Sequence, residues 1–306
     1  MLNTRFNFDF MGKRKITSLI SGVLLLVSIA ALAIQGLNLG IDFTGGTLVE
    51  IGYEEAADLD QIRQSLLQSE FDDVIVQYFG SANDVLIRIP PREGLNSADV
   101  SNQVLNLLGS DAEMRRVEFV GPQVGEELKN DGGLAMLYAL FGIFIYVALR
   151  FQRRFSVGAI AALVHDVLIT LGFFAVTQMD FDLSVLAAVL AVIGYSLNDT
   201  IVVFDRVREN FKKLRDATAV EVFNSSINQM LSRTLITSLT TMLVLISLFI
   251  FGGEIIHSFA TALLIGVLIG TYSSIYVASP VTLALGISKE DLMPVEKEGA
   301  EIDSMP

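Results

Sequence analysis

Two aspartates stand within long apolar stretches of this sequence, where an ionisable side chain is uncommon. Asp166 follows His165 in the stretch 155–177, and Asp199 lies in the stretch 183–204. A charged side chain at the centre of a membrane helix costs about 2.5–3.5 kcal/mol, so aspartates at such places usually serve an ion or substrate path. Their carboxylates can bind and release protons. The chemistry that these residues suggest is therefore the transfer of protons or cations within a membrane.

A cation and a row of hydroxyl groups could complete a site around Asp199. Arg233 precedes the apolar stretch 234–252, and its long side chain could extend inward to Asp199. Hydroxyl residues follow it at helical spacing, at Thr234, Thr237, Ser238 and Thr241. The two charges could form a proton relay or a static ion pair that braces two helices, and the residue types alone leave both open.

The coupling ion could be H⁺ or Na⁺. Asn198 and Thr200 flank Asp199, and together with threonines such as Thr237 they offer oxygen ligands that could hold Na⁺. His165 has a simpler interpretation as a hydrogen-bonded packing residue, because no second ligand stands near it to complete a metal site. We therefore expect no metal and no cofactor other than the coupling ion.

Several classes of protein are excluded or disfavoured by composition. The chain has no cysteine and two histidines, which excludes thiolate metal sites and cysteine nucleophiles and disfavours a haem. Its net charge of −13 disfavours a nucleic-acid partner. A Gly-x-Gly-Asp motif, as in intramembrane aspartyl proteases, does not occur. We therefore expect a transport component without covalent catalysis, and not an enzyme.

Membrane helices must position these side chains. Apolar residues make up 52% of the 306 residues and charged residues only 18%, whereas soluble domains contain about 25% charged residues. The surplus falls into runs that can cross about 30 Å of hydrocarbon, where backbone groups must pair internally as helices do. We predict six spans, at 16–36, 131–149, 155–177, 183–204, 234–252 and 256–280, with Pro280 ending the last one.

The basic residues set the orientation of these spans. Lysine and arginine gather near span ends in three segments, 1–15, 150–154 and 205–233. The connection 178–182 contains none, so the positive-inside rule places both termini, with the acidic tail 286–306, in the cytoplasm. The first run also resembles a signal peptide, with Ala31-Leu32-Ala33 as a cleavage-like triplet, although its apolar length favours a retained span.

Residues 37–130, between the first two spans, have the pattern of a separate external domain in which acidic residues outnumber basic ones. An alternating strand at 47–53 is followed by a helix that Asp58 caps, a hairpin around 80–83, a second helix and a strand at 114–120. This βαββαβ order predicts a ferredoxin-like α+β domain. The domain contains no recognisable nucleophile–base pair, so we expect it to have a binding or mechanical role. Glycine-bearing segments at 36–46 and 121–133 could serve as its hinges.

Five motifs resemble those of the SecF subunits in the SecD/SecF family of protein-export membrane proteins. The run GIDFTGGT at 40–47 is similar to the family signature after the first span, with Gly40, Asp42, Phe43, Gly45 and Gly46. The other matches are GPQVG at 121–125, HDV at 165–167, VIGYSLNDTIVVFDRVREN at 192–210 and SRTLITSLTT at 232–241. Together the resemblance covers residues 10–285.

This resemblance implies an architecture and a set of partners. The family's SecF subunits are multi-pass proteins of the bacterial cytoplasmic membrane, and their six helices form half of a bundle of the resistance–nodulation–division (RND) type. They pair with SecD, associate with the SecYEG channel, with YajC as a further candidate, and use the proton motive force to move unfolded polypeptides after the SecA step. The resemblance assigns the proton relay to Asp199 and Arg233, and the supporting polar residues that we expect are Asn198, Thr200, Thr237, Asp166 and His165.

Two other functions stay open at this point. RND architecture commonly serves proton-coupled export of small amphiphiles, but such exporters usually have external domains much larger than residues 37–130. A purely structural subunit that docks SecD to the channel is the second alternative. It predicts that Asp199 can become asparagine with no loss beyond stability.

Overall fold

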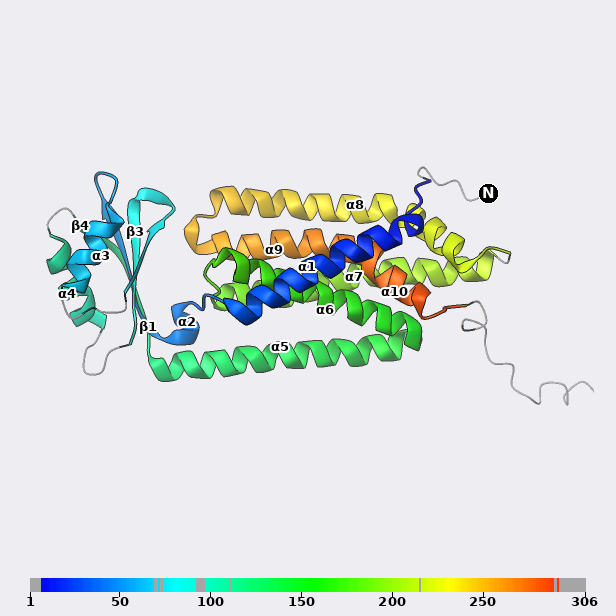
Figure 1. Cartoon of the computed structure of the whole chain (residues 1–306), viewed down its shortest axis with the longest axis horizontal. Coiled ribbons are helices and arrows are strands. Elements are labelled where there is room, and N and C mark those ends of the chain that lie inside the picture. Colours follow the sequence, from blue (N-terminus) through cyan, green and yellow to red (C-terminus); the bar gives the residue numbers. More distant parts are fainter. Residues whose placement is uncertain are drawn as a thin grey trace, which may run out of the picture.

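A small sheet domain and a long helical bundle make up this chain (Figure 1). The structure is a computed structural model, and it describes residues 7–68, 71, 74–91, 97–109, 112–214, 216–288 and 291. Most of the predicted acidic tail, 286–306, lies outside the described residues. The sheet domain stands at one end of the bundle, and the N-terminal segment lies at the other end.

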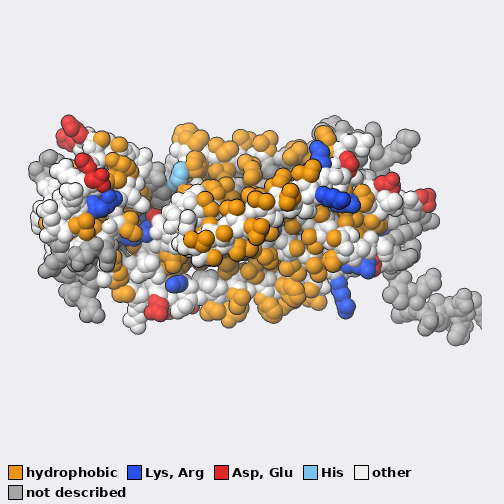
Figure 2. Space-filling view, viewed as in Figure 1, with side chains coloured by type: hydrophobic (Ala, Val, Ile, Leu, Met, Phe, Trp, Pro, Cys, Tyr) orange, Lys and Arg blue, Asp and Glu red, His pale blue; other side chains and the backbone are white. Residues whose placement is uncertain are grey.

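Six helices of the described chain are long and apolar enough to cross a membrane. They are α1 (Arg14–Ile34), α5 (Pro122–Arg150), α6 (Arg153–Thr177), α7 (Leu183–Lys213), α8 (Ala219–Phe251) and a last run of α9 (Glu254–Ser273), the π-helical turn η2 (Ser274–Ala278) and α10 (Ser279–Ala284). Apolar side chains cover the middle of the bundle, and charged side chains gather toward its two ends (Figure 2). The predicted class is confirmed: the chain is a multi-pass helical membrane protein.

Helices α6 and α7 form the centre of the bundle, since half or more of their apolar stretches is buried, whereas α1 and α5 are mostly exposed. Two glycines let α9 approach α7 closely. A Cβ atom on Gly266 would lie 2.0 Å from Val192 Cγ2, and one on Gly270 would lie 3.0 Å from Ser196 Cβ. Small residues of this kind allow the dispersion contacts that hold helices together in lipid.

The sheet domain has the predicted element order. Its elements are β1 (Gly46–Tyr53), α3 (Leu59–Leu67), β2 (Ile75–Phe79), β3 (Ser81–Ile89), α4 (Ser97–Leu108) and β4 (Ala112–Val120). The strands pair antiparallel in the order β2-β3-β1-β4, which confirms the ferredoxin-like arrangement. Asp58 caps α3 as expected, because its carboxylate accepts from the backbone N–H groups of Asp60 and Gln61. Buried residues of β1 and β3 pack against α3 and α4.

The helix that contains the second predicted span begins nine residues before the predicted start at 131. Helix α5 starts at Pro122, directly after the extended Gly121, and continues without a break to Arg150. Proline is well suited to a first helical turn, where its missing N–H would be unpaired in any residue. The proposed hinge at 121–133 is therefore wrong: this segment is a continuous helix in which Gly125 and Gly132 are buried.

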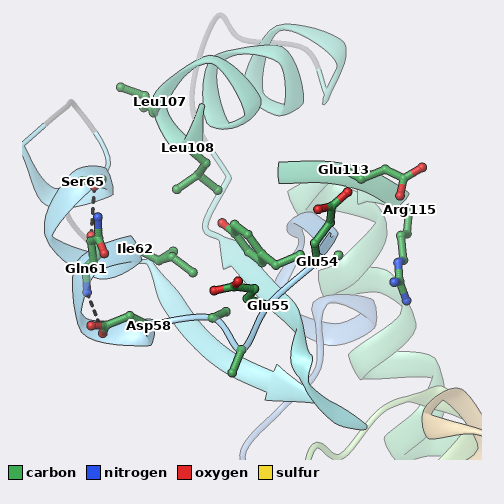
Figure 3. Close-up of a pocket in the computed structure, with 14 residues that line it drawn as sticks. Glu54, Glu55, Asp58, Gln61, Ile62, Ser65, Leu107, Leu108, Glu113 and Arg115 are labelled. Atoms are coloured by element: carbon green, nitrogen blue, oxygen red, sulfur yellow. Dashed lines mark hydrogen bonds between the residues drawn. The ribbon is translucent and has the colours of Figure 1, made fainter. Parts of the chain in front are cut away.

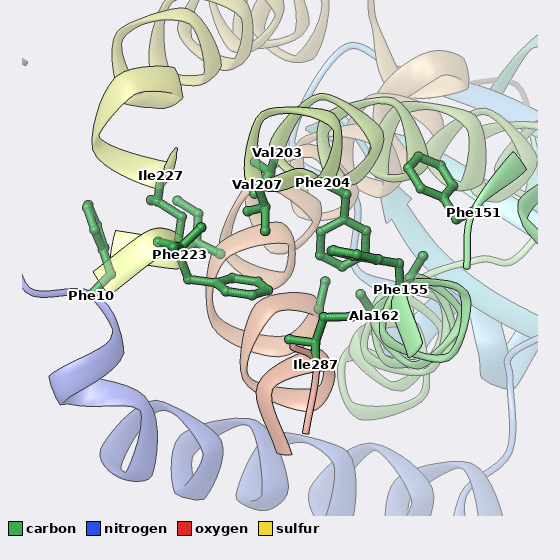
Figure 4. Packing of buried hydrophobic residues seen from close by; sticks show 14 of the residues in the cluster. Phe10, Phe151, Phe155, Ala162, Val203, Phe204, Val207, Phe223, Ile227 and Ile287 are labelled. Atoms are coloured by element: carbon green, nitrogen blue, oxygen red, sulfur yellow. The ribbon is translucent and has the colours of Figure 1, made fainter. Parts of the chain in front are cut away.

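The segment 205–233, predicted as a basic connection, consists mainly of helix ends. Helix α7 continues to Lys213 and α8 begins at Ala219 with a capping box formed by Thr218 and Glu221. These extensions are stabilised by a buried cluster in which the Phe211 ring of α7 and the Phe223 ring of α8 lie 6.3 Å apart; Figure 4 shows Phe223 in this cluster. Sequence reasoning ended the spans where charge began, but buried aromatics extend the helices beyond that point.

The prediction that Pro280 ends the last span was wrong. Proline normally breaks a helix, because it lacks an N–H and its ring clashes with the carbonyl of residue i−4. Here Pro280 stands in the first turn of α10, directly after the π-helical turn η2. The Ser279 hydroxyl donates to the Ser274 carbonyl across this turn, with an oxygen–oxygen distance of 3.2 Å. The wider turn accommodates Pro280, so the span continues to Ala284.

Candidate ion-relay site and domain junction

Asp199 lies on α7 and is held by two hydroxyl groups from neighbouring helices. The Thr234 hydroxyl of α8 donates to Asp199 Oδ1 at 3.1 Å, and the Ser274 hydroxyl of η2 donates to Oδ2 at 3.2 Å. The carboxylate is only partly buried. Within the described chain, its hydrogen bonds come from hydroxyls and not from Arg233, which differs from the ion pair that we expected.

Asp166 is fully buried on α6 and has three partners. The Ser196 hydroxyl donates to its Oδ2 atom at 2.5 Å, and the Ser273 hydroxyl donates to the same oxygen at 2.6 Å. Its Oδ1 atom lies 2.9 Å from His165 Nδ1. These partners come from α6, α7 and α9, so Asp166 ties together three helices at the centre of the bundle. His165 is bonded through Nδ1 alone, since its Nε2 atom has no partner among the described residues.

Adjacent serines connect the two aspartates. Ser273 ends α9 and bonds to Asp166, and Ser274 begins the π-helical turn and bonds to Asp199. π-helical turns inside α-helices occur frequently at functional sites. Sequence reasoning missed both serines, although a Ser-Ser pair in an apolar stretch shortly before Pro280 was a signal that could have identified them.

The hydroxyl row of α8 divides between two faces. Thr234 and Ser238 are buried, and the Ser238 Oγ lies 2.7 Å from Thr271 Oγ1 on α9. Thr237 is exposed and donates to the Arg233 carbonyl of its own helix, so it does not support Asp199. The reason is helical geometry: Thr237 and Ser238 are adjacent residues and so lie about 100° apart around the helix axis, on opposite sides of Thr234.

The remaining predicted site residues do not surround Asp199 in this chain. Arg233 and Asn198 are both exposed, and Thr200 is buried with no hydrogen-bond partner for its hydroxyl among the described residues. No group of three or more His, Cys, Asp or Glu side chains in the described part of the chain could hold a metal ion. What the structure assembles is thus a carboxylate with hydroxyl donors beside an exposed, polar helix face.

The signature GIDFTGGT forms the junction between the bundle and the sheet domain. Asp42 lies in the short helix α2 (Ile41–Thr44), and its carboxylate accepts from the Leu183 N–H at the start of α7, at 3.0 Å. The Gly40 N–H donates to the Phe181 carbonyl at 2.9 Å, and the Phe43 ring stacks on Phe181. The helix that carries Asp199 therefore begins at this junction.

The two glycines of the signature are required by close approach and by backbone angle. Gly45 has φ +70°, and a Cβ on it would lie 2.8 Å from the Pro122 Cα. Gly46 has φ +125°, and its Cβ would lie 2.5 Å from the Ile89 carbonyl oxygen. L-residues rarely adopt such φ values, so only glycine fits without strain.

A charged cluster fastens the sheet domain to the loop between α6 and α7. The Arg88 guanidinium of β3 pairs with the Asp180 carboxylate at 2.9 Å and also donates to the Leu39 carbonyl at 3.2 Å. The Asn38 amide donates to the same Asp180 oxygen at 2.8 Å. Arg88 is buried and Asp180 is largely buried. We call Arg88, Asp180 and Asn38 the domain latch.

Asp180→Asn should loosen the domain latch. Removing one partner of a buried ion pair costs about 3–5 kcal/mol, and an exposed pair contributes about 1 kcal/mol or less. We expect an intermediate cost near 2 kcal/mol, because Asp180 keeps some contact with solvent. Hydrogen exchange at the amides of 38–42 should then quicken by about thirtyfold. Asp60→Asn, which removes an exposed pair with Arg63 on the far side of the domain, is the control. Equal exchange in both variants would contradict the role of the latch.

The sheet domain also contains an open cleft of 1120 Å³, away from the bundle (Figure 3). Its rim is acidic and its wall includes apolar side chains of α3 and α4, with Glu54, Glu55, Asp58, Glu113, Ile62 and Leu108 among the lining residues. Arg115 also lines it, but pairs with Asp84 at 2.5 Å. The cleft therefore presents net negative charge beside apolar surface.

Comparison with known proteins gives matches over nearly the whole chain. The family model described as protein export membrane protein SecD/SecF, C-terminal, matches residues 100–288, and the SecD/SecF GG motif matches residues 30–57. The protein translocase subunit SecF of Vibrio alginolyticus is 51% identical over 100% of this chain and 99% of its own length. That of Escherichia coli O157:H7 is 45% identical over 97% of this chain and 94% of its own length.

Solved structures agree with these matches. The crystal structure of SecDF, a translocon-associated membrane protein from Thermus thermophilus, is 36% identical with a TM-score of 0.85. The match covers 93% of this chain but only 39% of that longer one. SecDF in a super-membrane-facing form gives a TM-score of 0.69 at the same identity and coverage. On the evidence of its six helices, its junction signature and these matches, this chain belongs to the SecD/SecF family of protein-export membrane proteins.

Proposed function

We propose that this chain is a Sec translocase subunit that uses a proton gradient to assist the export of unfolded polypeptides. The observation that carries the proposal is Asp199, an ionisable group within a membrane helix that accepts bonds from two hydroxyls and forms no ion pair with a cation of the described residues. A charged carboxylate is costly to place within a membrane, and residues that bear this cost usually mark an ion or substrate path. Membership of a family of protein-export membrane proteins supports the export role.

The partner that completes the site is SecD. Half of the apolar stretch of α7 is buried, yet Ala187, Ala191, Gly194 and Asn198 are exposed along one stripe of this helix. A Cβ on Gly194 would meet no atom within 4 Å. Arg233 and Thr237 of α8 are exposed at the level of Asp199 on the next helix. A second six-helix subunit packed on this face would approach closely and would bury Asn198 and Arg233 beside Asp199. The greater length of the SecDF chain agrees with a second half of this kind.

H⁺ is the coupling ion that we favour over Na⁺. A sodium site needs several oxygens that converge on the ion, but among the described side chains only Thr234 and Ser274 bring an oxygen within hydrogen-bond distance of Asp199, and Ser274 also lies 3.0 Å from the Thr271 carbonyl. Asn198 is exposed and Thr200 has no bond to Asp199, so the sodium ligands suggested by the sequence do not gather in the described chain. A proton needs only the carboxylate and a donor network.

Movement can pass from Asp199 to the sheet domain through α7. This helix is continuous, and its first residue, Leu183, bonds to Asp42 of the junction. The distance from Leu183 to Asp199 along the axis is about 24 Å at ~1.5 Å per residue. A change in the bonds of Asp199 that shifts α7 would therefore displace α2 and the domain latch. The lower TM-score against the super-membrane-facing form supports more than one arrangement in this family.

The acidic cleft is the surface that we propose for contact with an exported polypeptide. Its acidic rim suits the lysines and arginines of an unfolded chain, and its apolar wall suits the apolar residues next to them.

SecYEG is the channel that we expect beside this subunit, with YajC as a further candidate. We place the protein in the bacterial cytoplasmic membrane with both termini in the cytoplasm, because the arginine-rich end of the bundle lies away from the sheet domain.

The identity of the ion can be tested in vesicles that contain this chain, SecD and the translocon. An imposed proton gradient should stimulate export, and an imposed sodium gradient of equal size should not. Thr234→Ala removes a hydrogen bond of about 1 kcal/mol and should lower the stimulation about fivefold. Ser247→Ala, on the same helix but bonded only to the Leu243 carbonyl, is the matched control. Stimulation by sodium alone would overturn the choice of ion.

A further inference from the structure

His165 and Asp166 form a buried pair that the site around Asp199 does not use. Asp166 is fully buried and His165 is 2% exposed. Among the described residues, the partners of Asp166 are two serines and His165, and none is a lysine or arginine. An unpaired charge at this depth would be costly, so the pair should be neutral as a whole. It then holds one shared proton, on either the carboxyl group or the imidazole.

The second ring nitrogen of His165 is the unusual feature of this pair. Nε2 is buried and has no hydrogen-bond partner among the described residues. In every protonation state this nitrogen is either a donor or an acceptor. Buried polar atoms almost always have a partner, and the exceptions commonly have a bridging water or a chemical role. The Tyr272 ring stacks on the imidazole, with the two ring centres 6.2 Å apart.

A groove lies beside this imidazole. It has a volume of 590 Å³ and is bounded by α1, α6, η2 and α10, with His165, Ser18 and Ser21 as its polar lining. It lies toward the bundle end opposite the sheet domain, because α1 begins at Arg14 and α10 ends at Ala284. A water molecule occupies about 30 Å³ and needs two to four polar partners. The rest of the lining is mainly apolar, and the groove is large enough for a short chain of waters that ends beside the His165 ring.

We propose that His165 and Asp166 are a second proton-holding pair of the relay, which exchanges its proton with water in this groove. The inference rests on the proposed function, since it assumes that Asp199 carries protons. In one transfer, the Asp166 proton moves to His165 Nδ1 and the Nε2 proton leaves to a groove water. A neutral imidazole, a carboxylate and one hydronium ion result. A proton from the Asp199 side then reprotonates Asp166, and the return of the imidazole proton from Nδ1 to Nε2 resets the pair.

The π-helical turn links this pair to the first carboxylate. Ser273 donates to Asp166 and the next residue, Ser274, donates to Asp199, so a change of charge at one aspartate moves the donor of the other. The other titratable groups that face the pair or the groove are Tyr272 of α9 and Tyr276 of η2. The lining residues from α1 are uncharged.

Water in the groove can be detected by cysteine labelling, because this chain has no cysteine of its own. The complex with SecD is placed in lipid vesicles and treated with a small, water-soluble methanethiosulfonate. Ser18, the site of Ser18→Cys, lines the groove. The neighbouring Leu19, the site of Leu19→Cys, is 69% exposed on the apolar surface. We expect Ser18→Cys to react at least about tenfold faster, since the reagent requires hydrated thiolate. Equal rates would mean that lipid fills the groove, and would overturn the proposal.

The role of the imidazole is tested by His165→Asn. The asparagine amide can donate to Asp166 from the position of Nδ1 but cannot pass a proton through a ring. We expect proton-driven export to fall at least about tenfold in this variant and in Asp166→Asn, with a flattened pH profile in His165→Asn. Wild-type stimulation with His165→Asn would show a packing residue and overturn the inference.

A parallel measurement on Asp199→Asn separates this inference from the proposed function. Loss of stimulation in Asp199→Asn alone would reject the second pair and keep the proposed function. Retention in all three variants would reject both. If His165→Asn fails to assemble with SecD, the labelling rates of Ser18→Cys and Leu19→Cys decide the matter.

Discussion

Asp199→Asn should abolish the proton-driven part of export while leaving assembly intact. Asparagine preserves the volume of the side chain, and its amide oxygen can still accept from one of the two hydroxyls, of Thr234 or Ser274, while its NH2 group donates to the other. It cannot bind or release a proton at neutral pH. A proton that crosses ~100 mV supplies about 2.3 kcal/mol, which corresponds to a factor of about 50 in rate if it is all used. We expect the stimulation by the proton motive force to fall toward zero.

The measurement is export into vesicles with and without a proton gradient, at matched levels of the complex. Asp205→Asn is a suitable control, because Asp205 lies on the same helix but is 43% exposed at the arginine-rich end and pairs with Arg150. It should keep the full stimulation. If Asp199→Asn also kept it, the relay would not pass through this residue, and the bracing role that the sequence left open would be correct.

Gly46→Ala should destabilise the sheet domain at its junction with the bundle. The new Cβ would lie 2.5 Å from the Ile89 carbonyl oxygen, which is backbone of the adjacent strand and cannot turn aside. A φ of +125° adds about 1–3 kcal/mol of strain, and a displaced β1–β3 hydrogen bond adds about 1 kcal/mol. Together these lower the free energy of unfolding of the domain by about 3 kcal/mol. Its midpoint should fall by more than about 10 °C.

Thermal unfolding of the domain can be followed by proteolysis within the intact complex. Gly121→Ala is the matched control at the same junction, because Gly121 has φ −63° and its Cβ would meet no atom within 4 Å. It should lower the midpoint by no more than a few degrees. A Gly46→Ala midpoint equal to that of Gly121→Ala would mean that the signature glycine is not required by the backbone.

The signature glycines and the ion site belong to one mechanical unit. Gly45 lets the end of α2 lie close to the start of α5, and Gly46 lets β1 lie close to Ile89 at the end of β3. Asp42, which precedes both glycines in the signature, bonds to the start of α7. Asp199 is on the same α7. We therefore expect damage at the junction to reduce proton-driven export even where Asp199 and its hydroxyl donors are unchanged.

The sequence by itself determined the membrane class, the six spans and the order of the external domain. These features depend on local rules: apolar length, hydrophobic period and turn residues. The cap at Asp58 and the strands that follow from alternation appear as predicted. Where local rules were the only guide, they also misled. Pro280 and the charged segment 205–233 were interpreted as the ends of helices. In the structure the last span continues past Pro280 beside a serine hydrogen bond, and α7 and α8 extend into 205–233 with buried aromatic side chains.

Only the tertiary structure decided how the polar groups in the bundle are paired. Asp166 and Asp199 were evident as unusual residues, but their partners stand on other helices, far along the chain. Ser273 and Ser274 face different aspartates because adjacent residues project about 100° apart around a helix axis, and only the packing of the helices places an aspartate in each direction. The same holds for Arg88 and Asp180, which meet only because the sheet domain sits on the loop before α7. Sequence periodicity specifies which face of an element is apolar, whereas hydrogen bonds between elements depend on their rotation and depth, which packing alone sets.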